Sequence, residues 1–170
     1  MNPIFHFAQG FYDVGFNAAY RNKDEKSDKG FQRLPVSIIN FNFAAELYLK
    51  GLHLLTTNQE RSGHEIWKLF KDLPVEIKIQ IEEKYDDLVL SDNEELGEYS
   101  AKFIINKLEP KTLRESSSLK DMLILHNKYF EEWRYLYENR KSIMFKYNFN
   151  QMNCFIKSLI ITINKIQSII

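Results

Sequence analysis

Polar side chains line one side of an otherwise apolar segment around residue 46. They fall four, four, three and four positions apart, which places them on one face of a helix: Asn42, Glu46, Lys50, His53 and Thr57. Glu46 precedes Lys50 by one helical turn, the order that favours an ion pair. Charges on a largely packed helix need a counter-charge or a ligand. The stripe is therefore either a solvated face or a groove that faces a ligand or a partner.

A second polar stripe precedes residue 140, with members four, three and four positions apart: Asn127, Glu131, Arg134 and Glu138. Arg134 can pair with both acids of its own helix, or with Glu46 across a bundle if the two helices face each other. The alternative is an ion-pair ladder on the surface, which adds little to stability.

Two histidines occupy positions where imidazole chemistry can be considered. His64 follows Gly63 at a predicted helix start, where an imidazole can cap the helix, bind phosphate, or act as an acid or a base. His126 falls on the apolar seam that runs from Met122 to Trp133. We expect His126 to be a hydrogen-bonded core residue rather than a ligand.

The composition excludes several kinds of site. Lys plus Arg equals Asp plus Glu at 23 each, so no global field favours nucleic acid or an anionic membrane, although a local basic groove is compatible with this balance. Cys154 is the only cysteine, which excludes an internal disulfide and a zinc site built on several cysteines. The chain has no glycine-rich phosphate loop and no pair of histidines at metal-binding spacing on one helix. We therefore expect no metal and no cofactor, and we expect Cys154 to fill core space.

Hydrophobic periodicity predicts the elements that position these residues. Apolar residues recur at helical spacing over 3–20, and the charged run 21–34 is predicted to be a mobile loop. Proline is favoured in the first turn of a helix, so the second helix is predicted to run from Pro35 to about Thr57. That helix is apolar on two faces, which indicates a central place in a bundle.

The middle of the chain is less regular. A short helix is predicted over 64–71 and a longer one over 74–88. Residues 75–81 alternate like a strand, but the helical period continues beyond them and favours a helix. The segment 91–117 is predicted to be an insert that is helical or irregular to about Leu108.

The last third of the chain completes an all-α prediction. A serine-rich cap precedes a long helix predicted over 118–139, and a polar connection leads to a last helix from about Phe149. Polar residues interrupt the apolar tail 152–170, so a buried amphipathic helix is favoured over a membrane span. We expect one domain over 1–170: an up-and-down bundle of about four to five core helices with a helical excursion at roughly 58–117. The start of the chain lacks the basic region of a signal peptide, and we expect a cytoplasmic protein.

The order of three short motifs resembles that of the HEPN (higher-eukaryote and prokaryote nucleotide-binding) superfamily. These are Ala-Glu-Leu-Tyr-Leu-Lys at 45–50, Gly-His-Glu-Ile-Trp-Lys-Leu at 63–69 and Trp-Arg-Tyr-Leu-Tyr-Glu at 133–138. The similarity covers roughly residues 35–90 and 118–140. It implies a helical bundle that often dimerises, and many relatives are ribonucleases of toxin–antitoxin, abortive-infection or other defence systems, while others only bind RNA or nucleotide. The resemblance thus implies a homodimer, RNA or nucleotide as ligand, and an antitoxin-like protein as a further candidate partner.

The chain departs from the family at the catalytic motif. Catalytic members carry an Arg, then four to six intervening residues, then a His, and no Arg precedes a His by that interval here. Arg140 is the nearest candidate, but Phe145, Lys146 and Tyr147 stand where the His would fall. An imidazole exchanges a proton near neutral pH and a phenol hardly does. An enzyme of the usual HEPN type is therefore disfavoured.

Three hypotheses follow from these observations. The leading one is a HEPN-like domain that binds RNA, a nucleotide or a protein partner without the usual catalytic motif. Its candidate ligand-binding residues are Glu46, Lys50, His64, Arg134, Tyr135, Glu138 and Arg140, and Lys141, Lys146 and Tyr147 can also hold a phosphate or stack a base. The first alternative is a divergent, metal-independent ribonuclease whose acid–base set is Glu46, Lys50, His64 and Arg134. The second is a structural or assembly protein whose stripes are internal ion pairs.

Overall fold

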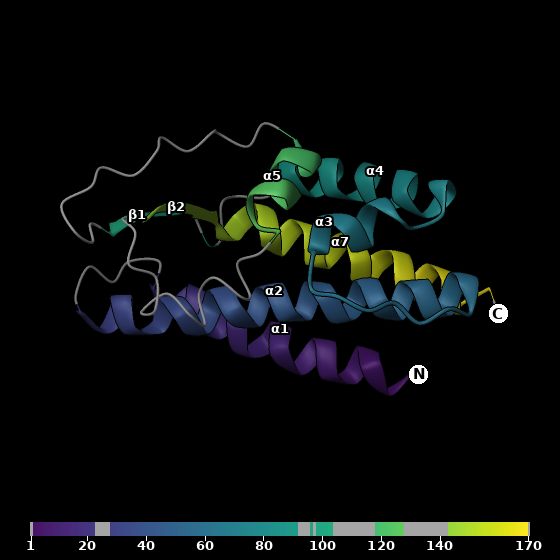
Figure 1. Cartoon of the computed structure of the whole chain (residues 1–170), viewed down its shortest axis with the longest axis horizontal. Helices are drawn as coiled ribbons and strands as arrows, with labels where there is room; N and C mark the ends of the chain where they lie inside the picture. The colour runs from purple at the N-terminus through teal and green to yellow at the C-terminus, as the bar shows by residue number, and fades with distance from the viewer. Residues whose placement is uncertain are drawn as a thin grey trace.

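The computed structural model of the chain describes residues 2–22, 28–91, 96, 98–103, 118–127 and 143–169. Within these ranges, six helices pack into a bundle and two short strands pair at one end of it (Figure 1). The helices are α1 Pro3–Asn22, α2 Asp28–Thr57, α3 Ile66–Lys71, α4 Val75–Ser91, α5 Leu119–Leu125 and α7 Phe149–Gln167, and the strands are β1 Glu98–Phe103 and β2 Ile143–Asn148. The predicted all-α helical bundle is confirmed.

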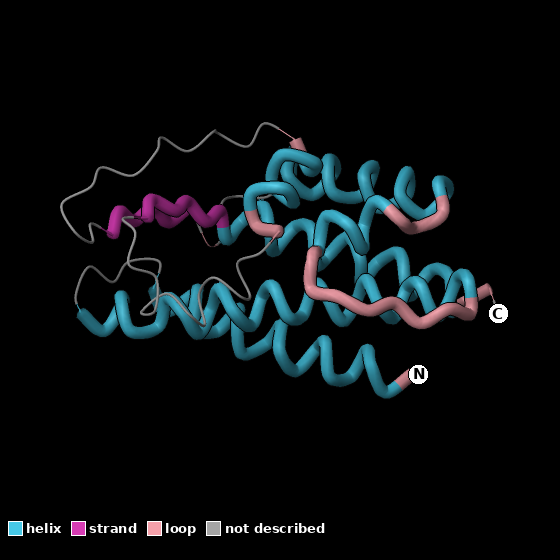
Figure 2. Tube along the Cα trace, in the orientation of Figure 1, coloured by secondary structure: helices cyan, strands magenta, loops and turns pink. Residues whose placement is uncertain are grey.

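The helices are stacked in successive layers. α1 packs on α2, α2 packs on α3 and α7, and α7 packs on α4 (Figure 1). The short α5 lies between α3 and α7. The two-stranded ribbon continues directly into α7, because β2 ends at Asn148 and α7 begins at the next residue (Figure 2).

The long contact between α1 and α2 depends on a glycine. The buried side of α1 carries Phe5, Ala8, Tyr12 and Ala19 at helical spacing. Gly15 lies on the same side, and a Cβ there would stand 3.1 Å from the backbone nitrogen of Phe41 in α2. The helix backbones can approach this closely because Gly15 has no side chain.

The start of α2 corrects the predicted loop at 21–34. Residues 21–22 end α1 and residues 28–34 already belong to α2, while 23–27 lie outside the described residues. The proline that was expected to open the helix lies inside it. A proline removes one backbone hydrogen bond of a helix, and the burial of Leu34 and Ile38 on either side of Pro35 offsets that loss.

The segment with strand-like alternation is a helix, as predicted. α4 spans Val75–Ser91, somewhat beyond the expected end. Its buried residues, Ile81 and Tyr85, follow the helical period, whereas Val75 and Ile79 of the alternating series are exposed. Burial against α7 follows the 3.6-residue period of the helix rather than the two-residue period of a strand.

Two segments of the chain form strands that the sequence did not predict. β1 lies where a helical or irregular insert was expected, and β2 lies where a polar connection was expected. The strands are antiparallel, with Glu98 opposite Asn148 and Phe103 opposite Ile143. Their pairing joins residues from 40 (Phe103 and Ile143) to 50 (Glu98 and Asn148) positions apart, and such long-range pairing leaves little trace in either short segment alone. The remainder of the predicted insert, at 92–95, 97 and 104–117, lies outside the described residues.

The helix predicted over 118–139 ends early. Ser118 caps α5 as expected, since its Oγ accepts a hydrogen bond from the Asp121 backbone nitrogen at 3.1 Å. The helix stops at Leu125, His126 and Asn127 form a turn, and residues 128–142 lie outside the described residues. The His126 ring is hydrogen-bonded through Nδ1 to Met122 O at 2.6 Å, and a bond from a side chain to the last turn competes with continuation of the helix. His126 is buried, which confirms the core role that was predicted for it.

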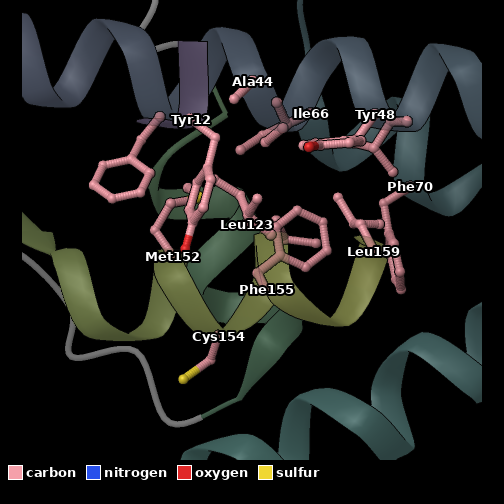
Figure 3. Close-up of a cluster of buried hydrophobic side chains, with 14 of the residues drawn as sticks. Tyr12, Ala44, Tyr48, Ile66, Phe70, Leu123, Met152, Cys154, Phe155 and Leu159 are labelled. Carbon is pink, nitrogen blue, oxygen red and sulfur yellow. The ribbon is translucent and has the colours of Figure 1, made fainter. Parts of the chain in front are cut away.

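The C-terminal helix begins where the sequence predicted. The Asn148 side chain accepts a hydrogen bond from Gln151 N at 2.8 Å and so caps α7. Met152, Phe155 and Leu159 of α7 point into the centre of the bundle, towards Tyr12, Ala44, Tyr48, Ile66, Phe70 and Leu123 of the surrounding helices (Figure 3). Cys154 is buried, which confirms its predicted place in the core. Among the helices of the described ranges, none has the length and apolarity needed to cross a bilayer.

Candidate functional site

A buried carboxylate in the middle of α2 contacts the side chains of a lysine and a histidine. The Glu46 side chain is 1% exposed, and Lys50 Nζ donates a hydrogen bond to its Oε1 at 2.6 Å. His64 Nδ1 lies 3.1 Å from Oε1 and 3.0 Å from Oε2 of the same carboxylate. A carboxylate oxygen only accepts hydrogen bonds, so Nδ1 carries the proton. We refer to Glu46, Lys50 and His64 as the Glu46 site.

The imidazole reaches the Glu46 site from a loop rather than from a helix. Residues 58–65, here named the strap, leave the end of α2 and return along it to α3 (Figure 1). The strap turns at two residues with positive φ, Asn58 at 53° and Gly63 at 92°. Asparagine and glycine are the residues that best tolerate this conformation. His64 therefore lies beside Glu46 although the two are eighteen positions apart.

Two further hydrogen bonds fix the helix that follows the strap. Trp67 N donates to Asn127 Oδ1 at 2.8 Å, which ties the start of α3 to the end of α5. His53 Nε2 lies 2.8 Å from Leu69 O, which ties α3 to α2. Burial lowers the pKa of His53, so the neutral ring donates from Nε2 to this carbonyl. Because the strap leads directly into α3, these two hydrogen bonds also help to hold His64 in position.

The polar stripe of α2 is mostly buried, so its interpretation as a solvated face is wrong. Asn42, Glu46 and His53 are at most 2% exposed. Asn42 Nδ2 donates to Tyr147 Oη at 3.0 Å and to Ile38 O at 2.9 Å. Thr57 Oγ1 donates to His53 O within its own helix. The stripe faces β2, the strap and α3, since the partners of Asn42, Glu46 and His53 lie in these segments.

Tyr147 does not have the role considered for it from the sequence. Its side chain is fully buried, so it is not available to stack a base from solution. Its ring meets the His126 ring edge to face with centroids 4.4 Å apart. Burial lowers the pKa of His126 to about 4, so that ring is neutral at pH 7. Tyr147 and His126 therefore form part of the core beside the stripe.

The structure brings together three of the seven candidate ligand-binding residues. Glu46, Lys50 and His64 meet at one place. Four candidates, Arg134, Tyr135, Glu138 and Arg140, lie outside the described residues, as do Lys141 and the side chain of Lys146. Arg134 was also expected to complete the acid–base set of the ribonuclease alternative.

The contacts that Trp67 makes with α5 were not predicted from the sequence. Trp67, within the second motif, is partly buried, and Lys120 Nζ of α5 lies 5.9 Å from the centroid of its ring. Asn127 was assigned to the second stripe, and its observed partner is the backbone of Trp67. The tryptophan within the motif was the one feature of the sequence that drew attention to this position. Its contacts could not be predicted, because helical spacing does not reveal a contact between α3 and α5.

A pocket on another side of α2 is separate from the Glu46 site. It has a volume of about 320 Å³ and is lined by Phe5, His6, Gln9, Tyr48, Ile160, Ile163 and Asn164. Tyr48 Oη donates to Gln9 Oε1 at 2.7 Å there. Tyr48 is two positions from both Glu46 and Lys50, a spacing that directs its side chain away from theirs.

The Glu46 site suits an anionic ligand. The Lys50 ammonium has three N–H donors and Glu46 takes one of them. His64 is 48% exposed, and its contact with Glu46 uses only one ring nitrogen. A neutral imidazole that donates from Nδ1 presents Nε2 as a proton acceptor, whereas a protonated one presents it as a donor. Among the described residues, no group of three or more His, Cys, Asp or Glu is placed to hold a metal ion.

Comparison with known proteins adds no relative from which a role can be transferred. No family model, no curated protein and no solved structure matches this chain.

Proposed function

We propose that this chain is a HEPN-like bundle that binds RNA, with a phosphate held between Lys50 and His64. The observation that carries the proposal is that one buried carboxylate holds a partly exposed lysine and an exposed histidine side by side. Glu46 fixes both groups in place, and the Lys50 ammonium has further N–H donors of the kind that bind phosphate oxygens. A nucleotide shares this chemistry and would bind through the same groups.

The arrangement of charges supports an anion rather than a cation. One carboxylate faces a lysine and an imidazole, so the site is neutral when His64 is neutral and carries one positive charge when His64 is protonated. A bound phosphate accepts hydrogen bonds from both side chains, and RNA binding is dominated by contacts of this kind.

The resemblance supplies the biological setting of the proposal. We propose a cytoplasmic homodimer that acts in a prokaryotic defence or toxin–antitoxin system, with an antitoxin-like protein as a second partner. The order of the motifs at 45–50, 63–69 and 133–138 supports this setting. Sedimentation of the purified chain tests the dimer.

The RNA proposal is tested by anisotropy of a fluorescent mixed-sequence RNA at several salt concentrations. Lys50→Met and His64→Gln should each weaken binding roughly tenfold, because each removes a hydrogen bond to a charged group. Lys50→Met should also lower the slope of log affinity against log salt by about 1, because one phosphate contact is lost.

Matched controls separate this effect from a general loss of charge. Lys84 forms an exposed pair with Asp87 on α4, and His6 is exposed on α1. Lys84→Met and His6→Gln should leave the affinity unchanged. RNA binding that is equally strong in all four variants, or no RNA binding by the unaltered chain, contradicts the proposal.

A specific observation favours ribonuclease activity as a second candidate function. Glu46 accepts from Nδ1 and so fixes the orientation and tautomer of His64, as a carboxylate does for a catalytic imidazole. Nε2 can then take the proton of a 2′-hydroxyl, and Lys50 can stabilise the charge on the phosphate. Cleavage of RNA by the chain in the presence of a chelator, abolished by His64→Ala and retained by His6→Ala, would establish it. Retained cleavage in His64→Ala assigns the activity elsewhere.

A further inference from the structure

One face of the Trp67 ring has an exposed lysine over it. Trp67 is the second residue of α3 and is only partly buried. Lys120 on α5 is exposed, and its ammonium lies 5.9 Å from the centroid of the indole. Phe70 packs against the ring from α3 itself, with centroids 6.1 Å apart and planes 30° apart. The Lys120 side chain that lies over this face is exposed and flexible, so it can move aside for another group from solution.

The ring is held in place by its own backbone. Trp67 N donates to Asn127 Oδ1 at 2.8 Å, and the neighbouring residues Ile66 and Phe70 are buried in the core. An aromatic side chain fixed in this way loses little conformational entropy when a flat ligand stacks on it. Trp67 is thus preorganised to receive such a ligand.

The position of Trp67 relates it to the Glu46 site. Trp67 follows His64 by three residues, so their Cα atoms are at most about 11 Å apart. Lys68 and Lys71 on α3 are exposed, as is Lys120. Basic side chains interleaved with an exposed aromatic face are the combination with which proteins bind single strands.

We propose that Trp67 stacks a base of single-stranded RNA whose neighbouring phosphate lies between Lys50 and His64. This inference rests on the proposed RNA binding and deepens it, since it selects a single strand over a duplex. The base displaces the Lys120 ammonium from the ring, and that flexible side chain turns to the phosphate backbone. A duplex keeps its bases stacked on one another and offers no free base face to the indole.

The test compares Trp67→Leu with Trp67→Phe in anisotropy with single-stranded and duplex RNA of the same sequence. Trp67→Leu should weaken binding of the single strand about tenfold, because the stacked base is lost. Trp67→Phe should retain most of the affinity. The salt slope should stay the same in both variants, in contrast to Lys50→Met, because stacking releases no counterions.

Two further readouts separate stacking from loss of structure. In a Trp133→Phe background Trp67 is the sole tryptophan, and single-stranded RNA should quench its fluorescence. Phe7→Leu, at an aromatic side chain of α1 that is 65% exposed, is the matched control and should leave the affinity unchanged. Should Trp67→Leu fail to fold, the quenching and the Trp67→Phe affinity decide the question in its place.

The possible results distinguish this inference from the proposed function. If Lys50→Met weakens binding while Trp67→Leu and Trp67→Phe both match the unaltered chain, the RNA site stands and the stacking role is overturned. Equal affinity for duplex and single strand, or no quenching on binding, also overturns the stacking role. If the unaltered chain binds no RNA, both proposals fail.

Discussion

At the scale of residues, the Glu46 carboxylate would be costly to bury without partners. Glu46 is almost fully buried, and its two partners keep part of their surface in solvent. A charge that is removed from water needs hydrogen-bonded counter-charges, and Lys50 and His64 supply them. The pairing of Glu46 with Lys50 was predictable from their spacing. The approach of His64 was not, because it depends on the path of the strap.

Replacing Glu46 by Gln should destabilise the fold. Glutamine has nearly the same shape, but its amide group presents N–H donors to the donors of Lys50 and His64. Both partners can turn towards solvent, so we expect a loss of about 2 kcal/mol rather than the full cost of an isolated buried charge. For a chain of this size the melting temperature should then fall by roughly 4–8 °C.

The control for this substitution is Asp87→Asn, which removes the carboxylate of an exposed ion pair on α4. It should leave the melting temperature unchanged, since exposed pairs contribute little. A melting temperature for Glu46→Gln equal to that of the unaltered chain would show that the buried pairs are not needed for stability.

At the scale of elements, the contact between α1 and α2 depends on glycine at one place and not at another. Gly10 and Gly15 both lie inside α1. A Cβ at Gly10 meets nothing within 4 Å, whereas one at Gly15 meets Phe41 N at 3.1 Å and Ser37 O at 3.3 Å. The backbone of α2 cannot yield as a flexible side chain would.

The two glycines should therefore respond to alanine in opposite directions. Gly10→Ala should raise the free energy of unfolding by about 0.5–1 kcal/mol, because alanine is the better helix former. Gly15→Ala gains the same propensity but pushes α1 away from α2, and it should lower the free energy of unfolding. Urea denaturation of both variants measures the difference. A gain in stability for Gly15→Ala would mean that the two helices can separate at little cost.

Some helices could be predicted from the local sequence, whereas the early start of α2 and the two strands could not. The start of α7 was predicted at about Phe149, where a polar connection gives way to an apolar segment, and the helical nature of α4 followed from apolar periodicity. The early start of α2 did not, because a proline that usually opens a helix lies within one whose buried residues continue on both sides. The strands β1 and β2 stabilise each other over a long sequence separation, so neither segment alone contains the information.

At the scale of the whole molecule, two buried histidines couple stability to pH. Burial lowers the pKa of both His53 and His126, the latter from 6.5 to about 4. The unfolded chain therefore binds protons on these rings at a pH where the folded chain does not. This contribution to stability is fully present above pH 6.5 and is lost as the pH falls towards 4.

The chain should thus become less stable between pH 6.5 and 4, and His126 alone should account for about 3 kcal/mol of the loss. His126→Phe keeps an aromatic ring against Tyr147 and removes the titration, so its stability should depend less on pH in this interval. Urea denaturation at half-unit pH steps measures both curves. The exposed His6→Gln variant should follow the unaltered chain, and identical curves for His126→Phe would contradict the assignment.

The fold was more predictable than the site. Helical periodicity is a local property that many residues report together, and it was enough to predict a helical bundle. The site depends on which helices become neighbours, as with Trp67 and Asn127, whose hydrogen bond joins α3 to α5. That information resides in the packing of the whole chain.

The strap has a consequence for how such a bundle can diversify. Gln59, Glu60, Arg61 and Ser62 are exposed. The number of residues in this segment helps to set where the imidazole of His64 falls along α2. Insertion or deletion of a single residue here would detach that ring from its carboxylate while the helices stay assembled. Descendants of one scaffold can therefore lose or regain this chemistry by a length change in a surface segment, with no compensating substitution in the interior.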